Sequence, residues 1–338
     1  MQHKPSDAAN EPPSAAQAEG LLVLAAAADL MVMPDRWRLG PAQATVSAQQ
    51  PAFATAAAAL DWLEQQLPTL RAAIIRAHQR GLHELAWQLC EAMWPLFLFR
   101  RHYDDWVATH EIGVQAARSG RTPRAVPRMM VALASAYCSL HRFDEAAALC
   151  EEALHLERTG GHTLGEAAAL HGLGVAYLGL KRPEHALDLF DQARRIHTYL
   201  GRKRGIALIA RRMGEAERMA GRPQQATLHL HQAYRLFSEL NDLYNEARTL
   251  TELGRTHVAL GRPRSARAPL ETALVLALQM GALHQQASAQ MLLGQVLRTL
   301  GHHFEADKHL AEAQQVFDAL GAPEAQNVQG SGPEEPTS

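Results

Sequence analysis

The side chains best suited to chemistry in this sequence are arginines that recur along one half of a 40-residue pattern. A guanidinium group binds a carboxylate or a phosphate through two parallel hydrogen bonds, so a row of arginines favours an anionic partner. An ion pair within one helix, between Arg211 and Glu215 four residues later, is the alternative. The candidate binding residues are Arg128, His171, Arg211, Glu215, Arg218, Arg248, Arg255, Met291, Gln295 and Arg298.

Sequence patterns typical of enzymes and of metal sites are missing from the chain. It contains no GxxxxGK[ST] phosphate-binding loop and no GxSxG nucleophile motif. The cysteines Cys90, Cys138 and Cys150 do not have the spacing of metal ligands, and we expect buried, reduced thiols. We therefore predict a protein that is not an enzyme, with no catalytic residue, no metal and no cofactor.

Small residues that repeat every 40 positions set the register in which the arginines lie. Gly174, Gly214, Gly254 and Gly294 share one position, which Ala134 occupies one unit earlier. Two series of alanines keep the same step: Ala146, Ala186, Ala226, Ala266 and Ala306, and Ala153, Ala193, Ala233, Ala273 and Ala313. A fixed period of this length is typical of a solenoid. Because glycine within a helix costs roughly 1 kcal/mol relative to alanine, its recurrence indicates close contact between helices.

Each unit reads as two helices joined by a tight turn. Between residues 164 and 200, apolar residues follow helical spacing on both sides of a break at residues 181–183. Pro183, Pro223 and Pro263 are placed to start the second helix of their units. Glycines at 221, 261 and 301 are placed to end the first helix in a left-handed conformation. We predict an all-α fold with five units, over 124–159, 163–199, 204–239, 244–279 and 284–320.

The unit resembles a tetratricopeptide repeat (TPR). Leu173-Gly174, Tyr177, Ala186, Phe190 and Ala193 match that family's pattern in order and spacing, although the usual unit has about 34 residues. The resemblance implies a right-handed α-solenoid of TPR-like helix-turn-helix repeats with a period of 40. It also implies that the first helix of each unit lines a concave groove, in which the ten candidate residues would lie.

A second resemblance covers residues 21 to about 120. The stretches LMVMPDRWRL from residue 30, ALDWLE from residue 59, HELAWQL from residue 83 and RHYDDWVATH from residue 101 carry it. They resemble the segment between the ATPase and the TPR region of actinobacterial STAND (NB-ARC/TPR) transcriptional regulators. The resemblance implies a sensor region without its ATPase, since the phosphate-binding loop is missing.

The predicted organisation has five parts. We expect a disordered leader at 1–20, a short helix and linker at 21–52, N-terminal helices with a degenerate capping repeat at 53–122, five repeats at 123–322, and a disordered tail at 323–338. The apolar stretch at 21–30 is too short to span a membrane. One continuous helix, kinked at Pro68, is expected over 55–79, and a helix pair over 84–100 and 103–119.

Composition narrows the function without naming a partner. The 338 residues have a net charge of −2 and a pI near 6.8, which argues against a dedicated nucleic-acid binder. We predict a cytoplasmic scaffold that binds a protein or peptide. A ligand that is acidic or has a free C-terminal carboxylate would suit the arginines, and self-association of the chain into a homo-oligomer stays open. Two alternatives stay open. One is a transcriptional regulator acting with DNA or with an NB-ARC ATPase in trans. The other senses a small molecule or signalling peptide, with Trp87, Trp94, Phe97 and Phe99 lining its pocket.

Overall fold

A computed structural model describes residues 14–46 and 52–328 of the chain, and in these ranges the protein is helical with no strand. The chain divides into two compact units, which are described separately. The first comprises residues up to Leu96 together with Asp104–Ala132, and the second comprises Phe97–Tyr103 together with residues from Leu133 onward. The predicted all-α solenoid is confirmed.

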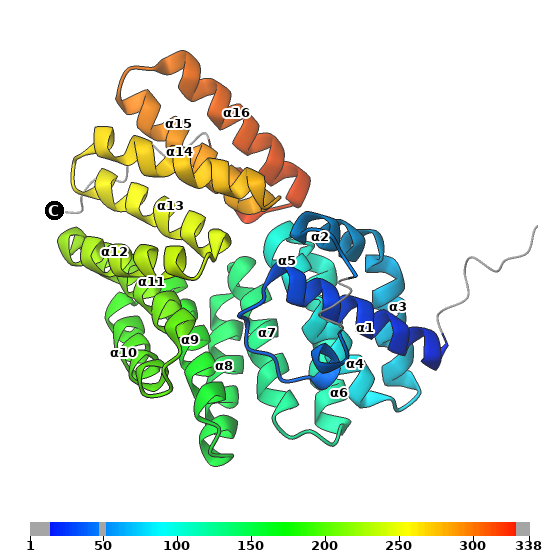
Figure 1. The fold of residues 1–338 in the computed structure, drawn as a ribbon. Coiled ribbons are helices and arrows are strands. Elements are labelled where there is room, and N and C mark those ends of the chain that lie inside the picture. The colour runs from blue at the N-terminus through cyan, green and yellow to red at the C-terminus, as the bar shows by residue number, and fades with distance from the viewer. Residues whose placement is uncertain (1–13, 47–51, 329–338) are drawn as a thin grey trace, which may run out of the picture. The chain divides into compact units, whose positions relative to one another are not determined.

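The second unit contains the repeats (Figure 1). Each repeat pairs a first and a second helix: α7 (Ala125–Ser139) with α8 (Phe143–Thr159), α9 (Thr163–Gly179) with α10 (Pro183–Tyr199), α11 (Lys203–Met219) with α12 (Pro223–Glu239), α13 (Leu243–Ala259) with α14 (Pro263–Gln279), and α15 (Leu283–Thr299) with α16 (His303–Leu320). The N-terminal part of α7 belongs to the first unit.

The predicted turns are present, and a second series accompanies them. Gly221 ends α11 with a φ of 75°, and Gly261 and Gly301 adopt the same left-handed conformation. His141 and Lys181 hold equivalent positions with φ near 60° although they carry a β-carbon. Left-handed residues also join one repeat to the next, at Gly161, Gly201, Asn241 and Gly281, and Gly321 ends the last repeat in the same conformation. This second series was not predicted from the sequence.

The repeated glycine inside each first helix is explained by the side chain that faces it. A β-carbon added to Gly174 would lie 2.4 Å from the ring of Phe190, and one added to Gly214 would lie 2.5 Å from Leu230. The alanines of the second helices are fully buried, as at Ala186 and Ala193. The expected close contact between the two helices of a repeat is therefore confirmed.

Neighbouring first helices also pack directly against one another. Among the described residues, α9 contacts α11, α11 contacts α13, and α13 contacts α15, whereas each second helix contacts mainly the first helices before and after it. The first helices therefore form the more tightly spaced layer of the solenoid. We call the face of this layer that α9, α11, α13 and α15 form the inner surface.

The segment Phe97–Tyr103 packs on the inner surface of the second unit. It includes the end of α5 (Trp94–Arg100). Phe99 stacks on Tyr244 of α13 with 4.3 Å between ring centroids, and the Tyr244 hydroxyl donates a hydrogen bond to the Leu98 carbonyl oxygen over 3.3 Å. Tyr103 is buried in a cluster that includes Met291. This part of the inner surface is thus covered by the chain itself.

The first unit begins with α1 (Ala15–Val32), which is longer than the predicted helix at 21–30. Ser14 caps it: the Ser14 hydroxyl accepts from the Gln17 amide, and the Gln17 side chain accepts from the Ser14 amide. Residues 15–20 are therefore helical rather than part of a disordered leader, while residues 1–13 lie outside the described ranges. By length and composition α1 alone, among the described helices, is able to cross a membrane. It packs instead on α2 (Ala56–Gln65) and α4 (His83–Ala92).

Two predicted helices are each broken into a pair. The expected helix over 55–79 ends at Gln65 and resumes as α3 (Leu67–Gln79), with Pro68 in the first turn of α3 rather than at a kink. The helix expected over 84–100 is interrupted at Met93, between α4 and α5. A proline in a first turn lacks only an amide that would have no partner there, so it favours a new start. The helix over 103–119 is α6 (Tyr103–Ser119), as predicted.

Two segments expected to lack structure contain short 3-10 helices. These are η1 (Pro41–Thr45) in the predicted linker and η2 (Pro323–Asn327) in the predicted tail. η2 is held by Glu324, whose carboxylate is 3.0 Å from the His284 ring, and is followed by the buried Val328. Residues 47–51 and 329–338, which complete those predicted segments, lie outside the described ranges.

We predict that the glycine position is coupled to the residue that faces it. Gly174→Ala should lower the free energy of unfolding by about 1–3 kcal/mol through overpacking against Phe190, despite the better helix propensity of alanine. In the first regular unit Ala134 occupies this position and Cys150 the facing one. Gly174→Ala should therefore cost less in a Phe190→Cys background. A double-mutant cycle by denaturant unfolding measures the coupling, and additive effects of the two substitutions would contradict it.

Candidate functional site

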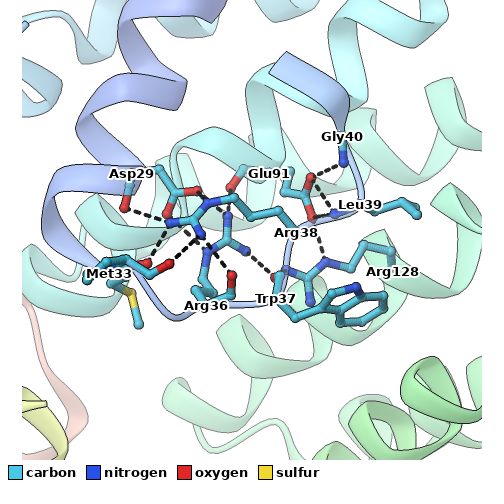
Figure 2. A network of polar contacts seen from close by, with 10 residues as sticks. Asp29, Met33, Arg36, Trp37, Arg38, Leu39, Gly40, Glu91 and Arg128 are labelled. Atoms are coloured by element: carbon cyan, nitrogen blue, oxygen red, sulfur yellow. Dashed lines mark hydrogen bonds and ion pairs between the residues drawn. The ribbon is translucent and has the colours of Figure 1, made fainter. Parts of the chain in front are cut away.

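The structure separates Arg128 from the other nine candidate residues. It lies in the first unit, where its Nε donates to Glu91 over 2.8 Å, its Nη2 donates to the Trp37 carbonyl oxygen over 3.1 Å, and its guanidinium stacks 4.8 Å from the Trp37 ring centre (Figure 2). Glu91 also accepts from the amides of Leu39 and Gly40, over 3.0 and 2.7 Å. Arg128 is therefore occupied in holding the segment before α2 against α4.

The same network continues to Asp29 of α1. Its carboxylate binds Arg36 and Arg38, whose side chains also donate to backbone carbonyl oxygens (Figure 2). Burial opposes the charge on Glu91, but Arg128, Arg36 and the two amides together keep the pKa of Glu91 below its ordinary value. Residues 34–40 of the predicted linker are thus ordered. The two buried carboxylates that the segment contacts, Asp29 and Glu91, are both neutralised by arginines.

Arg211 of α11 is the most unusual candidate residue. Its side chain is only 2% exposed, and within the described residues it makes no hydrogen bond or ion pair. Glu215, which the alternative interpretation paired with Arg211, binds Arg212 instead over 2.7 Å. Burial, followed by repulsion from Arg248 and Arg212, lowers the pKa of Arg211 well below its ordinary value. A guanidinium nevertheless stays charged at neutral pH, so Arg211 is a buried cation that Glu215 and Glu252 attract from a distance but that forms no direct ion pair with either of them.

The equivalent residues of the other repeats show why Arg211 stands apart. His171, Thr251 and Met291 are related to it by steps of 40 residues. The Thr251 hydroxyl donates to the Ala247 carbonyl oxygen over 3.0 Å and accepts from Gln285 over 2.8 Å. Met291 is apolar and buried beside Tyr103. His171 is half-buried against Phe190, and burial keeps its pKa well below 6.5, so it is uncharged at neutral pH. Among these four equivalent residues, only Arg211 brings a charge into the layer of first helices.

Arg248 of α13 is a second guanidinium without an acidic partner. It is half-buried and lies 5.6 Å from the ring centre of Tyr244, in a cation–π contact, and no ion pair forms on it within the described part of the chain. Burial lowers the pKa of Arg248, and nearby Arg212 and Arg101 lower it further. Arg211 and Arg248 are therefore two guanidinium groups on neighbouring first helices that form no direct ion pair, and Glu215 attracts both of them.

The remaining candidate residues are satisfied or lie elsewhere. Glu252 attracts both Arg218 and Arg255, at 3.6 and 3.4 Å. Arg298 is half exposed and binds Asp307 of α16 over 2.8 Å, and Gln295 is half-buried. The arrangement thus reduces the predicted row of arginines to a centre at Arg211 and Arg248. Four of its neighbours, Arg101, Arg212, Tyr244 and Glu252, were not predicted. Arg212 adjoins Arg211, and Tyr244 and Glu252 each lie four residues from Arg248, so helical spacing could have found these three. Only Arg101 is brought here by the fold.

The chemistry available at this centre is anion binding. Guanidinium groups donate hydrogen bonds but do not exchange protons at neutral pH, and the two nearby carboxylates are held in ion pairs. No group of three or more metal-ligating side chains occurs among the described residues. The aromatic residues weighed as a pocket are packed instead: Trp87, Phe97 and Phe99 are buried, and Trp94 lies edge-on to Trp106 at 5.7 Å.

Comparison with known families identifies the repeats. Residues 126–198 and 205–279 match the tetratricopeptide repeat family, so these segments are TPR units, as the resemblance implied. No curated protein matches the sequence of this chain.

Similar solved structures share the fold at low sequence identity. The Rap conjugation gene regulator of plasmid pLS20, in complex with the Phr* peptide, has a TM-score of 0.57 at 11% identity, covering 93% of this chain and 98% of its own. NprR in complex with its cognate peptide NprX has a TM-score of 0.56 at 13% identity, covering 80% and 84%. Aspartyl phosphate phosphatase F from Bacillus subtilis has a TM-score of 0.53 at 10% identity, covering 91% and 95%.

We predict that Arg211 destabilises the unliganded protein. Replacing a buried charge that has no partner by an apolar side chain of similar length removes a desolvation cost, so Arg211→Met should raise the free energy of unfolding by about 1–3 kcal/mol. Arg212→Met is the matched control on the same helix. It should lower stability, because it leaves Glu215 without its partner. Denaturant unfolding of both variants measures the contrast, and destabilisation by Arg211→Met would contradict it.

We also predict an acid-sensitive contribution from His171. Its folded pKa lies well below 6.5 because burial and the guanidinium groups of Arg212 and Arg211 oppose its charge. The unfolded state therefore binds one more proton than the folded state once the pH falls below about 6.5, and stability declines as the pH drops. In His171→Gln, the slope of the unfolding free energy against pH should become shallower, by an amount that corresponds to at most about one bound proton. An unchanged slope between about pH 7 and pH 5 would refute this assignment.

Proposed function

We propose that this chain is a non-catalytic regulatory module that binds a peptide, or an extended segment of a protein, along the inner surface of its repeats. The observation that carries the proposal is the pair Arg211 and Arg248, two cations on the neighbouring first helices α11 and α13 that form no direct ion pair with an acidic side chain. A buried charge without a partner is unfavourable, and an anionic ligand would remove the penalty.

The chemistry of the pair favours an acidic peptide or one with a free C-terminal carboxylate. A carboxylate can accept two parallel hydrogen bonds from one guanidinium, and the hydrogen bond is stronger where water is partly excluded. Helices of this kind pack about 8–10 Å apart, so α9, α11, α13 and α15 together span about 30 Å. An extended peptide of roughly nine residues, at about 3.3 Å per residue, fits that length.

The solved structures of similar fold support this role by analogy. Two of them, NprR and the pLS20 conjugation regulator, contain bound peptides by their own descriptions. We extend from them only the binding of a peptide, and we propose with it a cytoplasmic regulatory role. An NB-ARC ATPase or a DNA-binding protein acting in trans, as the N-terminal resemblance to STAND regulators implies, is the form of regulation in which such a sensor would be expected.

The proposal predicts that an acidic ligand depends on the unpaired arginines. The full chain, the double variant Arg211→Gln/Arg248→Gln and the control Arg298→Gln should be immobilised side by side, with circular dichroism showing equal helicity. Exposed to a pool of random nonapeptides, the full chain and the control should retain acidic peptides. The double variant should retain them at least tenfold more weakly, as expected when a charge-assisted contact is lost.

Two results would contradict the proposal. In the first, the full chain retains no peptide from the pool, which shows that the inner surface is not a peptide site. In the second, hydrogen exchange shows that retained peptides protect only α1 to α4 of the first unit, which moves the binding site away from the inner surface.

A further inference from the structure

One turn of the chain already lies on the inner surface, and its contacts are of the kind that a bound peptide makes. The segment Phe97–Tyr103 consists of the last turn of α5, two linking residues and the first residue of α6. Its flanking residues Leu96 and Asp104 are assigned to the first unit, whereas the segment itself is assigned to the second. The helices α8 to α16 contain no residue of this segment. It is therefore an occupant of the inner surface rather than a part of the repeats that form it.

The first contact is made on Tyr244 of α13. The Phe99 ring stacks on the Tyr244 ring at an interplanar angle of 26°, and the Tyr244 hydroxyl donates a hydrogen bond to the Leu98 carbonyl oxygen over 3.3 Å. The stack requires only an aromatic side chain, and every residue of a peptide offers a carbonyl oxygen. Tyr244 is thus able to bind an aromatic residue of another chain in the same way.

The second contact is apolar and lies on the last repeat. Tyr103 is 6% exposed and packs in a cluster with Met291 of α15, Phe317 of α16 and Val328 after η2, which we call the Met291 cluster. The buried Tyr103 hydroxyl makes no hydrogen bond within the described residues. A buried hydroxyl without a partner opposes its own burial. The Met291 cluster is therefore better suited to a phenylalanine than to the tyrosine that fills it.

Three features oppose the seated position of the segment. The helix α5 has only seven residues, and a helix this short has little stability of its own, so its last turn is able to unwind. Arg101 has a φ of 57°, a left-handed conformation that is unfavourable for a residue with a β-carbon. Arg101 also repels Arg248 of α13, although its Nη1 donates to the Ser139 hydroxyl over 2.7 Å. The two aromatic contacts therefore hold the segment against these costs.

We propose that Tyr244 and the Met291 cluster form an aromatic subsite, which Phe99 and Tyr103 occupy in the unliganded protein and which aromatic side chains of a peptide take when the segment withdraws. The subsite rests on the proposed function and deepens it: the ligand carries aromatic residues as well as an acidic group, and it competes with the protein's own chain. Because only molecules with a withdrawn segment bind the peptide in full, the apparent affinity is reduced by the fraction of such molecules.

A nonapeptide capped at both ends, with the sequence LFLFRRHYD of residues 96–104, tests the subsite in trans. It should bind to the double variant Phe99→Ala/Tyr103→Ala, whose own segment no longer fills the subsite. Calorimetric titration should show that it binds to the full chain at least about tenfold more weakly. The matched control is the same nonapeptide with alanine at the positions of Phe99 and Tyr103, which should bind to neither chain. Circular dichroism compares the helicity of the two chains.

A conservative substitution shifts the competition in the opposite direction. Tyr103→Phe removes only the unpaired hydroxyl, so the segment should be seated more firmly and the thermal midpoint should rise. From the pool of random nonapeptides, Tyr103→Phe should retain peptides at least about threefold more weakly than the full chain, and the double variant at least about tenfold more tightly. Peptides retained by the double variant should be enriched in aromatic residues relative to the pool.

The outcomes separate this inference from the proposed function. Equal and measurable retention of pool peptides by the full chain and by Tyr103→Phe overturns the competition, whether or not the double variant folds, and leaves the proposed function standing. Failure of a folded double variant to bind the segment nonapeptide, or equal binding of its alanine form, overturns the aromatic subsite. Binding of the segment nonapeptide that depends on both aromatic residues, with no pool peptide retained by any chain, upholds the subsite and overturns the proposed function.

Discussion

The close approach of two helices within each repeat is the constraint on which the rest of the structure depends. A side chain from the second helix fills the space where a β-carbon of the first helix would lie, as Phe190 does beside Gly174. This contact allows no larger residue without displacement of the helix, so it fixes the register of the pair. Repeated every 40 residues, it also fixes the position of each first helix relative to the next.

Tight packing of the first helices determines the fate of the polar residues that they carry. The first helices pack in a tight layer, part of which the segment Phe97–Tyr103 covers, so a polar group that is buried there needs a partner from the protein or from a ligand. Thr251 finds one in Gln285, and Met291 needs none because it is apolar. Arg211 and Arg248 lack an acidic partner. We interpret these two arginines as features kept for binding rather than for stability, since buried ionic groups seldom contribute to stability on their own.

The regular part of this architecture was accessible from the sequence, because its cause is local and repeated. Glycine and alanine at a fixed step, with prolines at helix starts, predicted the repeats and their turns correctly. Features that depend on distant partners were not accessible. The segment from Pro34 to Gly40 was predicted to be a linker. It is ordered by contacts with Glu91 and Arg128, which lie so far along the chain that the segment's own sequence gives no sign of them.

The choice of ion pairs illustrates the same limit within the candidate site. Glu215 lies three residues from Arg212 and four from Arg211, and both spacings are suitable for a pair in a helix. The two arginines differ in burial, since Arg212 is half-buried and Arg211 is enclosed. Glu215 pairs with the less buried of the two. Sequence spacing therefore located the row of arginines but not the two that form no direct ion pair.

The most direct test of the central claim is the hydrogen-exchange footprint of a retained acidic peptide on the full chain. Binding at Arg211 and Arg248 predicts slower amide exchange in α11 and α13, with a weaker effect in α9. Slower exchange confined to other helices, with α11 and α13 unchanged, would contradict a ligand site on the inner surface.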